Sequence, residues 1–235
     1  PSIVVAHNIC PSTLTNKKEG HETPEIVSES GNKIKYNFTS NYEGFIPLVI
    51  KDLILRRVRI KELLKKDREN KILEARNYAL KTIANASYGY YAFFGARWYS
   101  RQCAESITAF ARQYTQDVIK KAQDENYEVI YSDTDSIFLS LGNKTKEEAL
   151  IFLEKINREL PSLMELDLED FYKRGIFTAK RTEKEGAKKK YALIDDKENM
   201  KIKGFESVRR NWSKIAKEVQ RTGLEIILKE HNPKK

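Results

Sequence analysis

The pattern that most constrains the fold is a repeated helical period within residues 44–89. After Pro47, apolar residues recur near the three-to-four spacing of an amphipathic helix. The run "KKDREN" interrupts this period, and "KILEARNYALKTIANASYG" resumes it with good helix formers until Gly89. The sequence therefore predicts an antiparallel helical pair over residues 44–89. Its first helix carries a basic face that consists of Arg56, Arg57, Arg59 and Lys61.

The rest of the chain mixes strand-like and helical segments. Residues 1–43 have turn chemistry and little helical period, which predicts strands and loops. Helical periods return over residues 104–125, 145–160 and 207–228, and Thr145 and Glu148 have the spacing of a capping box. Strand-like runs cover residues 128–141, 171–182 and 188–195, with a turn expected at residues 185–187. Strands and helices that do not strictly alternate predict an α+β chain.

Composition narrows the class of protein. The 235 residues are 40% hydrophobic, which is enough to bury a core. The sequence contains no run of 18 apolar residues and does not open like a secretory signal, so we expect a soluble, unexported protein. Cys10 and Cys103 lie far apart and outside any Cys/His cluster, which predicts buried or half-buried thiols instead of a zinc site or a disulfide framework.

The positive charge is concentrated at one end of the chain. The formal net charge is +9, and residues 171–235 contain 19 Lys or Arg against nine Asp or Glu, so the whole excess lies in this segment. A one-sided basic surface favours a polyanionic partner, most often nucleic acid. A solvated lysine-rich face remains an alternative on charge alone.

Two carboxylates lie in the stretch "EVIYSDTDSIFLSL", residues 128–141. In an extended chain Asp133 and Asp135 would project from the same side, with Cα atoms about 7 Å apart. Mg²⁺ prefers carboxylate oxygens and takes one or two of them together with substrate phosphates. The stretch thus predicts a metal site, with a simple polar hairpin turn as the alternative. A glycosyltransferase Asp-x-Asp motif is a further alternative.

A second constellation lies in "KTIANASYG", residues 81–89. Lys81, Asn85 and Tyr88 have the spacing that places side chains along one face of a helix. An ammonium can pair with phosphate, and an aromatic ring can stack on a base. Together with Arg57 and Lys61 on the preceding helix, this face could hold a nucleoside triphosphate. A solvated helix pair is the alternative that spacing alone leaves open.

These two motifs together resemble family B DNA polymerases. "KTIANASYG" is similar to the fingers motif Lys-x-x-x-Asn-x-x-Tyr-Gly, and "YSDTDS" to the palm motif Tyr-x-Asp-Thr-Asp-Ser. Further similar segments, closest to archaeal members, are "PSIVVAHNICPSTL", "GFIPLVIKDLILRRVRIK", "ARWYSRQCAESITAFAR", "KKKY" and "KGFESVRRNW". The resemblance implies a palm, an antiparallel sheet with helices, into which a helical fingers hairpin is inserted. Its expected boundaries are palm 1–43, fingers 44–94, palm 95–190 and start of the thumb 191–235.

The resemblance also implies a function and a site. The function is template-directed DNA synthesis, in which a dNTP is joined to the 3′ end of a primer annealed to its template. Asp135 would bind two Mg²⁺ ions, with Asp133 in a lesser or indirect role. The incoming triphosphate would be bound by Lys81 and Arg57 with Lys61, and the nascent base pair would be lined by Asn85 and Tyr88. The duplex backbone would be held by Lys188, Lys189, Lys190, Tyr191, Arg209 and Arg210.

The sequence departs from the family pattern in several places. It begins after the palm motif's other Asp and its Tyr, so we expect a split or truncated C-terminal piece with half a metal site. An N-terminal polymerase chain that carries the exonuclease and the other Asp would complete it, with a sliding clamp as a further partner. Gly95 and Asn211 replace common Lys and Asp residues, and we expect both changes to be tolerated. The resemblance implies a cytoplasmic protein of an archaeal cell or its virus with no membrane partner. An inactive DNA-binding subunit is the alternative.

Overall fold

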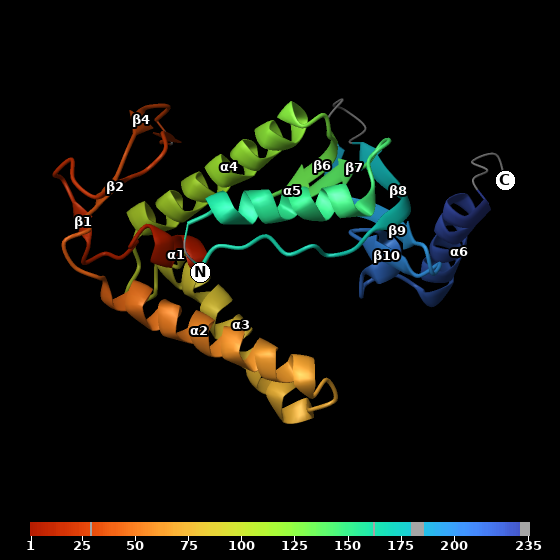
Figure 1. Ribbon diagram of the computed structural model, residues 1–235, viewed down its shortest axis with the longest axis horizontal. Helices are drawn as coiled ribbons and strands as arrows, with labels where there is room; N and C mark the ends of the chain where they lie inside the picture. Colours follow the sequence, from red (N-terminus) through yellow and green to blue (C-terminus); the bar gives the residue numbers. More distant parts are fainter. Residues whose placement is uncertain (29, 162, 180–185, 231–235) are drawn as a thin grey trace. The chain divides into compact units, whose positions relative to one another are not determined.

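The computed structural model describes residues 1–28, 30–161, 163–179 and 186–230. Within these residues, helices α1–α6 and short antiparallel strands β1–β10 form the predicted α+β chain (Figure 1). The chain divides into two compact units, Pro1–Lys120 with Glu154–Leu166 and Lys121–Leu153 with Asp167–Lys235. None of the described helices is long and apolar enough to cross a bilayer.

The predicted helical pair is confirmed in the first unit. It consists of α2, Phe45–Lys66, and α3, Lys71–Ala92, which run side by side as a hairpin (Figure 1). Asn70 begins the second helix, because its side-chain oxygen accepts a hydrogen bond of 3.0 Å from the Leu73 N–H. The hairpin is also anchored at its start, where the Gly44 N–H donates to Asn8 Oδ1 at 2.8 Å.

The N-terminal segment differs from the predicted strands and loops, because it opens with a short helix. Helix α1 spans Ser2–Ala6 and has no side-chain cap, so its stability comes from burial, with Val4 fully buried. The strands that follow are two residues each: β1 Leu14–Thr15, β2 His21–Glu22, β3 Ile26–Val27, β4 Lys33–Ile34 and β5 Asn37–Phe38. They form one sheet of order β1-β5-β2 and one pair, β3-β4.

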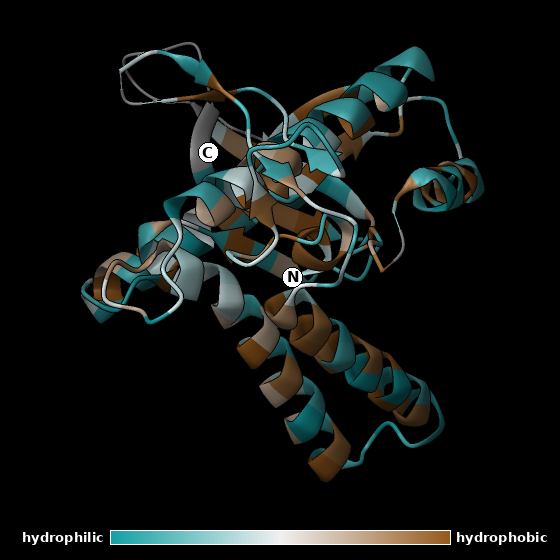
Figure 2. Cartoon of the chain, turned by 90° about the vertical axis from the view of Figure 1, so that its left-hand side faces the viewer, coloured by the Kyte–Doolittle hydropathy of each residue, from teal (hydrophilic) through white to brown (hydrophobic). Residues whose placement is uncertain are grey.

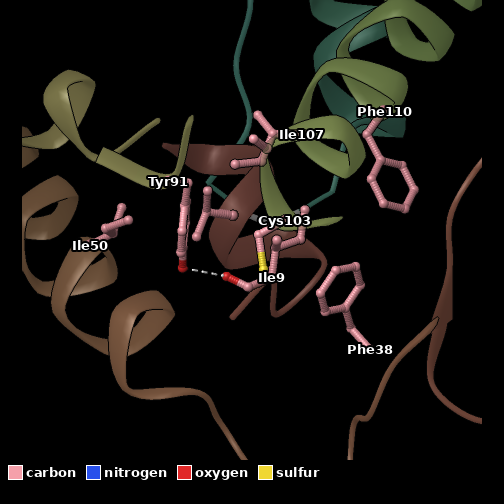
Figure 3. Packing of buried hydrophobic residues seen from close by; sticks show 9 residues of the cluster. Ile9, Phe38, Ile50, Tyr91, Cys103, Ile107 and Phe110 are labelled. Carbon is pink, nitrogen blue, oxygen red and sulfur yellow. Dashed lines mark hydrogen bonds between the residues drawn. The ribbon is translucent and has the colours of Figure 1, made fainter. Parts of the chain in front are cut away.

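The core of the first unit joins this N-terminal segment to three helices. Helix α4 spans Arg101–Asp124, close to the predicted 104–125. Its buried face and those of its neighbours form one apolar cluster (Figure 3): Val4, Ile9, Phe38, Ile50, Tyr91, Cys103, Ala104, Ile107 and Phe110. Cys10 and Cys103 are both buried and free, as predicted. The cluster joins residues as far apart in sequence as Ile9 and Cys103. It therefore holds the α2–α3 hairpin against the N-terminal segment and α4.

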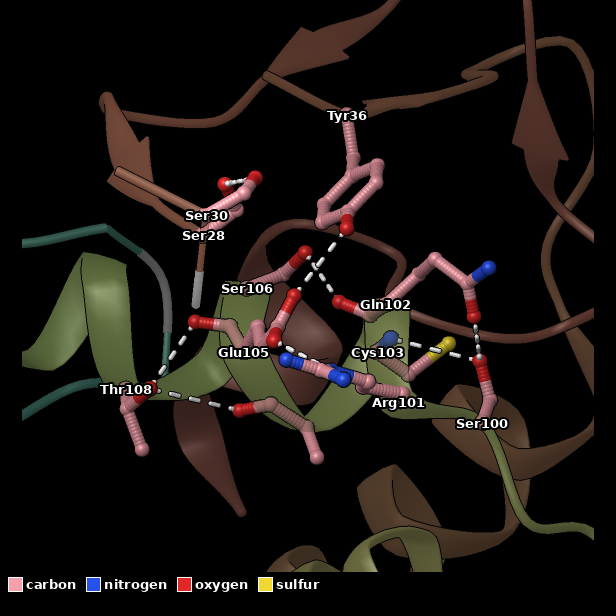
Figure 4. Close-up of polar contacts among 11 residues, drawn as sticks. Ser28, Ser30, Tyr36, Ser100, Arg101, Gln102, Cys103, Glu105, Ser106 and Thr108 are labelled. Atoms are coloured by element: carbon pink, nitrogen blue, oxygen red, sulfur yellow. Dashed lines mark hydrogen bonds and ion pairs between the residues drawn. The ribbon is translucent and has the colours of Figure 1, made fainter. Parts of the chain in front are cut away.

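Polar contacts explain why α4 begins three residues earlier than expected (Figure 4). Ser100 Oγ accepts a hydrogen bond of 3.3 Å from the Cys103 N–H, which caps the first turn. Arg101 Nε donates to Glu105 Oε1 at 2.7 Å, and the Tyr36 hydroxyl donates to Glu105 Oε2 at 3.0 Å. The helix thus begins with the polar residues Arg101 and Gln102, which carry no apolar period for sequence analysis to detect.

The elements that follow α4 are a β-hairpin and a capped helix. Strands β6, Glu128–Asp133, and β7, Ser136–Ser140, pair antiparallel. Helix α5 spans Lys146–Glu159, and its capping box is confirmed. The Glu148 N–H donates to Thr145 Oγ1 at 3.1 Å, and the Thr145 N–H donates to Glu148 Oε2 at 2.7 Å.

A three-stranded antiparallel sheet of order β10-β9-β8 follows. Its strands are β8 Tyr172–Ala179, β9 Gly186–Asp195 and β10 Met200–Lys203, and sequence analysis did not predict β10. The turn expected at residues 185–187 is wrong in its second half, because Gly186 and Ala187 belong to β9, and Gly186 pairs with Ala179. Glu185, the first residue of that turn, lies outside the described residues.

The last helix, α6, spans Lys214–Glu230 and packs on this sheet (Figure 1). The prediction of a helix from residue 207 is wrong at its start, where a single 3₁₀ turn, η1, covers Glu206–Val208. Ser213 begins the helix proper, since its hydroxyl oxygen accepts a hydrogen bond of 3.3 Å from the Ala216 N–H. The buried contacts of α6 with the sheet and η1 come from Ala192, Ile194, Phe205, Leu224 and Leu228.

Candidate active-site residues

Asp133 and Asp135 lie at the tip of the β6–β7 hairpin and not along one extended strand. Asp133 is the last residue of β6 and pairs with Ser136, the first residue of β7, so Thr134 and Asp135 form a two-residue turn. Thr134 has a φ of +34°, and the Asp135 N–H donates back to the Asp133 carbonyl. The expected extended geometry is therefore wrong, because the turn reverses the chain between the two carboxylates.

The two carboxylates differ in their surroundings. The Asp133 side chain is only 16% exposed, and its carboxylate accepts a hydrogen bond of 3.1 Å from the Thr134 hydroxyl. Its other oxygen lies 4.0 Å from the Lys189 ammonium. Asp135 is exposed, and its side chain has no hydrogen-bond or ion-pair partner among the described residues. Asp135 is thus the carboxylate available to an incoming cation.

Four aromatic rings hold the hairpin to the β8–β9 strands. Tyr131 and Phe138 of the hairpin contact Phe177 and Tyr191 of the sheet, with ring centroids 5.1–5.9 Å apart. The Tyr131 hydroxyl also accepts a hydrogen bond of 2.6 Å from the Lys189 N–H. Such ring pairs add about 0.5–1.5 kcal/mol each beyond the area that they bury. Sequence analysis missed Tyr131, Phe138 and Phe177, and predicted Tyr191 as a DNA contact, although it is only 5% exposed.

The predicted nucleotide-binding residues lie on the α2–α3 hairpin, in the first unit. Lys81, Asn85 and Tyr88 are all exposed on α3, and their spacing places them on one face of that helix. Arg57 on α2 is half-buried, and its Nε donates to Asn77 Oδ1 at 3.2 Å, so it bridges the two helices. Lys61, one turn later on α2, is half-buried as well. Polar and apolar residues alternate along both helices, in agreement with the hairpin's largely exposed surface (Figure 2).

The predicted DNA-binding residues of the second unit fall into two classes. Lys189, Arg209 and Arg210 are exposed. Lys190 and Tyr191 face inward, because the Lys190 ammonium donates to Glu206 Oε1 at 2.8 Å and Tyr191 lies in the ring cluster. Lys188 belongs to β9, and its side chain lies outside the described part of the chain.

The carboxylates fit a magnesium site only in part. Mg²⁺ binds one or two carboxylates together with phosphate oxygens and water, which suits the exposed Asp135 with Asp133 beside it. Among the described residues, no three His, Cys, Asp or Glu side chains are grouped as a metal site. Two hollows among the described residues, both lined by Tyr36, contain none of the predicted site residues.

Comparison with known proteins decides the family. The family model described as DNA polymerase family B matches residues 1–235. The chain belongs to the family B DNA polymerases. The resemblance predicted from the two motifs is therefore confirmed over the whole sequence.

Archaeal polymerases are among the relatives of this family B chain. It is 41% identical to the DNA polymerase of Thermococcus gorgonarius over 97% of its own length and 29% of that protein. It is also 41% identical to DNA polymerase 1 of Pyrococcus abyssi, over 99% of this chain and 29% of the relative. The solved family B polymerase from Pyrobaculum calidifontis is similar in structure, with a TM-score of 0.70, 34% identity and coverage of 97% of this chain and 28% of that one. The chain therefore spans less than a third of the length of these relatives.

Proposed function

We propose that this chain takes part in template-directed DNA synthesis, the transfer of a nucleotide from a dNTP to the 3′ end of a primer. The observation that carries the proposal is the Asp-Thr-Asp turn, which presents the Asp135 carboxylate without a protein partner among the described residues, in a chain of the polymerase family. An exposed carboxylate held at a tight turn by a ring cluster is suited to a cation that a nucleotide brings with it.

The metal fits the hairpin as part of a site. Asp135 would hold the two Mg²⁺ ions, and Asp133 would have a lesser role beside it, since its carboxylate already has the Thr134 hydroxyl and the Lys189 ammonium nearby. When bound, the ions supply the positive charge that stabilises the attacking and leaving oxygens of an in-line displacement. The protein's own contribution is the fixed position of the carboxylates, which the hairpin and the ring cluster provide.

The remaining site residues bind and orient substrates. Lys81 and Arg57, with Lys61, bind the triphosphate, and Asn85 and Tyr88 line the base-pair pocket. Lys189, Arg209 and Arg210 contact the duplex backbone. Such contacts do not depend on base sequence, so they suit any template. In this proposal the α2–α3 hairpin is the fingers, residues 1–43 and 95–190 are palm, and residues 191–235 begin the thumb.

A complete metal site needs a further carboxylate. Because Asp133 has only a lesser role, the second metal-binding carboxylate comes from another part of the polymerase. The archaeal relatives, which are more than three times as long as this chain, leave room for such a part. That part, which also carries the exonuclease, lies in a partner chain or in the same polypeptide. This chain is therefore active only together with it.

Primer extension tests the proposal. A labelled primer-template with Mg²⁺ and dNTPs is incubated with the chain alone, and then with the segment that precedes the matched region in the Thermococcus gorgonarius polymerase. We expect extension only in the mixture. Asp135→Asn should abolish it, whereas Asp124→Asn, an exposed carboxylate on α4, should leave it unchanged. Duplex binding without extension in any mixture would instead identify a DNA-binding subunit.

A further inference from the structure

Lys190 makes contacts that differ from those of an exposed DNA-binding lysine. Its ammonium donates to Glu206 Oε1 at 2.8 Å and lies 5.1 Å from the centre of the Phe205 ring. The Lys190 side chain is 30% exposed, against 71% for its neighbour Lys189. The two lysines therefore differ in exposure and in partners, although both belong to the run "KKKY".

Glu206 connects Lys190 to α6. Its second oxygen, Oε2, accepts a hydrogen bond of 2.6 Å from Gln220 Nε2. Gln220 in turn uses its Oε1 to accept from the Ser207 N–H at 2.7 Å. Both oxygens of the carboxylate and both polar atoms of the amide are thus occupied, which ties β9, η1 and α6 together. We call these three side chains, Lys190, Glu206 and Gln220, the β9–α6 clamp.

Hydrogen bonds within the β9–α6 clamp favour the ionised form of the Glu206 carboxylate. The Lys190 and Gln220 side chains lower the pKa of Glu206 to about 2, so its carboxylate is ionised throughout the working range of pH. With a side-chain exposure of 19% for Glu206, water competes only in part for this pair. An ion pair that shares a third hydrogen-bonding group has a more defined geometry than an isolated surface pair.

The backbone before the clamp is equally constrained. Gly204 has a φ of +73°, and a Cβ at this position would lie 1.8 Å from the Lys189 carbonyl oxygen. The turn after β10 thus lies directly against the backbone of β9. Arg209 follows η1 immediately, and its Nη2 donates back to the Gly204 carbonyl at 3.3 Å. The position of Arg209 and of Arg210 therefore depends on how η1 is held.

We propose that Lys190 is a positioning residue for duplex binding. Through Glu206 and Gln220 it fixes η1 and the first half of α6, so that Arg209 and Arg210 present their guanidinium groups to the phosphate backbone. Lys190 itself does not contact phosphate, because its ammonium is committed to Glu206. This inference rests on the proposed function, namely that the second unit binds primer-template DNA.

The salt dependence of binding separates a positioning lysine from a phosphate contact. Each phosphate contact steepens the fall of log K with log salt concentration by about 0.9, and we call the magnitude of that fall the slope. We expect Lys190→Met and Glu206→Gln to weaken duplex binding about tenfold, measured by fluorescence anisotropy with the full chain, because η1 must then be ordered when the duplex binds. Arg209 and Arg210 still reach phosphate in the complex, so the slope should stay unchanged. Arg210→Gln should lower the slope by about one. Lys197→Met, an exposed lysine of the same unit, is the control and should change affinity least.

A charge exchange completes the test. In the double variant Lys190→Glu, Glu206→Lys the ion pair can form again with its direction reversed, so we expect affinity within about twofold of the unsubstituted chain. Thermal melting of each variant shows that it is folded. A slope for Lys190→Met as low as that for Arg210→Gln, together with no rescue by the exchange, would overturn the inference. No duplex binding by the unsubstituted chain would overturn the proposed function itself.

Discussion

The Tyr91 hydroxyl donates a hydrogen bond of 2.9 Å to the backbone carbonyl of Ile9 (Figure 3). Tyr91 is 1% exposed and Ile9 is fully buried, so the bond lies inside the core of the first unit. It joins the last turn of α3 to the segment that follows α1. Burial raises the pKa of Tyr91 well above its usual range, and the phenol therefore stays a donor at any ordinary pH.

Tyr91→Phe should destabilise the protein. The substitution leaves the Ile9 carbonyl buried without a donor, and such a group costs about 1–3 kcal/mol of unfolding free energy. Urea denaturation followed by circular dichroism measures this loss. Tyr90→Phe is the matched control, because Tyr90 is 45% exposed on the same helix. Equal midpoints for the two variants would show that the hydrogen bond contributes nothing.

Gly204→Ala should cost more stability than Gly142→Ala. Both glycines have positive φ, +73° and +56°, so each alanine meets the backbone strain of the left-handed region, about 1–2 kcal/mol. Only at Gly204 does the new Cβ also collide with backbone, whereas nothing lies within 4 Å at Gly142. Thermal melting should therefore show the larger drop for Gly204→Ala. A similar drop for both would mean that the backbone at Gly204 shifts to accommodate the added methyl group with no further loss of stability.

Sequence analysis predicted the elements whose causes are local. The α2–α3 hairpin follows from apolar period and from the Asn70 cap, and α5 follows from its capping box at Thr145. Elements that depend on distant partners were missed. Helix α1 exists because Val4 enters a core that is built from segments far along the chain. Strand β10 is recognisable only through its pairing with β9.

The candidate residues came from the two motifs together with their resemblance to the polymerase family, which selected Asp135, Lys81, Asn85 and Tyr88. Their roles stay predictions, and the contacts that support the Asp-Thr-Asp turn could not be predicted. The roles of Lys190 and Tyr191 depend on contacts with Glu206 and with rings from three other strands, which no local pattern encodes. The presence of an aromatic residue in each of the strand-like runs was the one signal that could have indicated the ring cluster.

Lys81→Ala should raise the KM for dNTP in the complemented enzyme. Lys81 is exposed on α3, and the loss of one phosphate-pairing ammonium should weaken triphosphate binding by about tenfold or more. Steady-state primer extension over a range of dNTP concentrations measures this change. Arg76→Ala, an exposed cation on the same helix, should leave the KM for dNTP unchanged. A rise in the Kd for duplex DNA instead would assign Lys81 to the template.

The stability of the protein should decline as the pH falls from about 6.5 towards 4. His7 stacks on Phe110 with ring centroids 3.6 Å apart, and its Nε2 lies 2.8 Å from the Tyr114 hydroxyl. Burial, with a smaller effect of His21, lowers the pKa of His7 to about 4 from its usual 6.5. Between these pH values His7 is protonated in the unfolded chain but neutral in the folded protein, so acid favours unfolding.

His7→Gln removes this titration and should flatten the dependence of the unfolding free energy on pH between about 6.5 and 4. Urea denaturation at half-unit pH steps measures the slope. Tyr114→Phe is the control, because it removes the hydrogen-bonding hydroxyl but keeps the buried imidazole, and it should keep the slope while it lowers stability at every pH. An unchanged slope in His7→Gln would assign the acid sensitivity to other groups. The contribution of Glu206 declines only below about pH 4.5, the ordinary pKa of a glutamate, because its pKa in the folded protein is lowered to about 2.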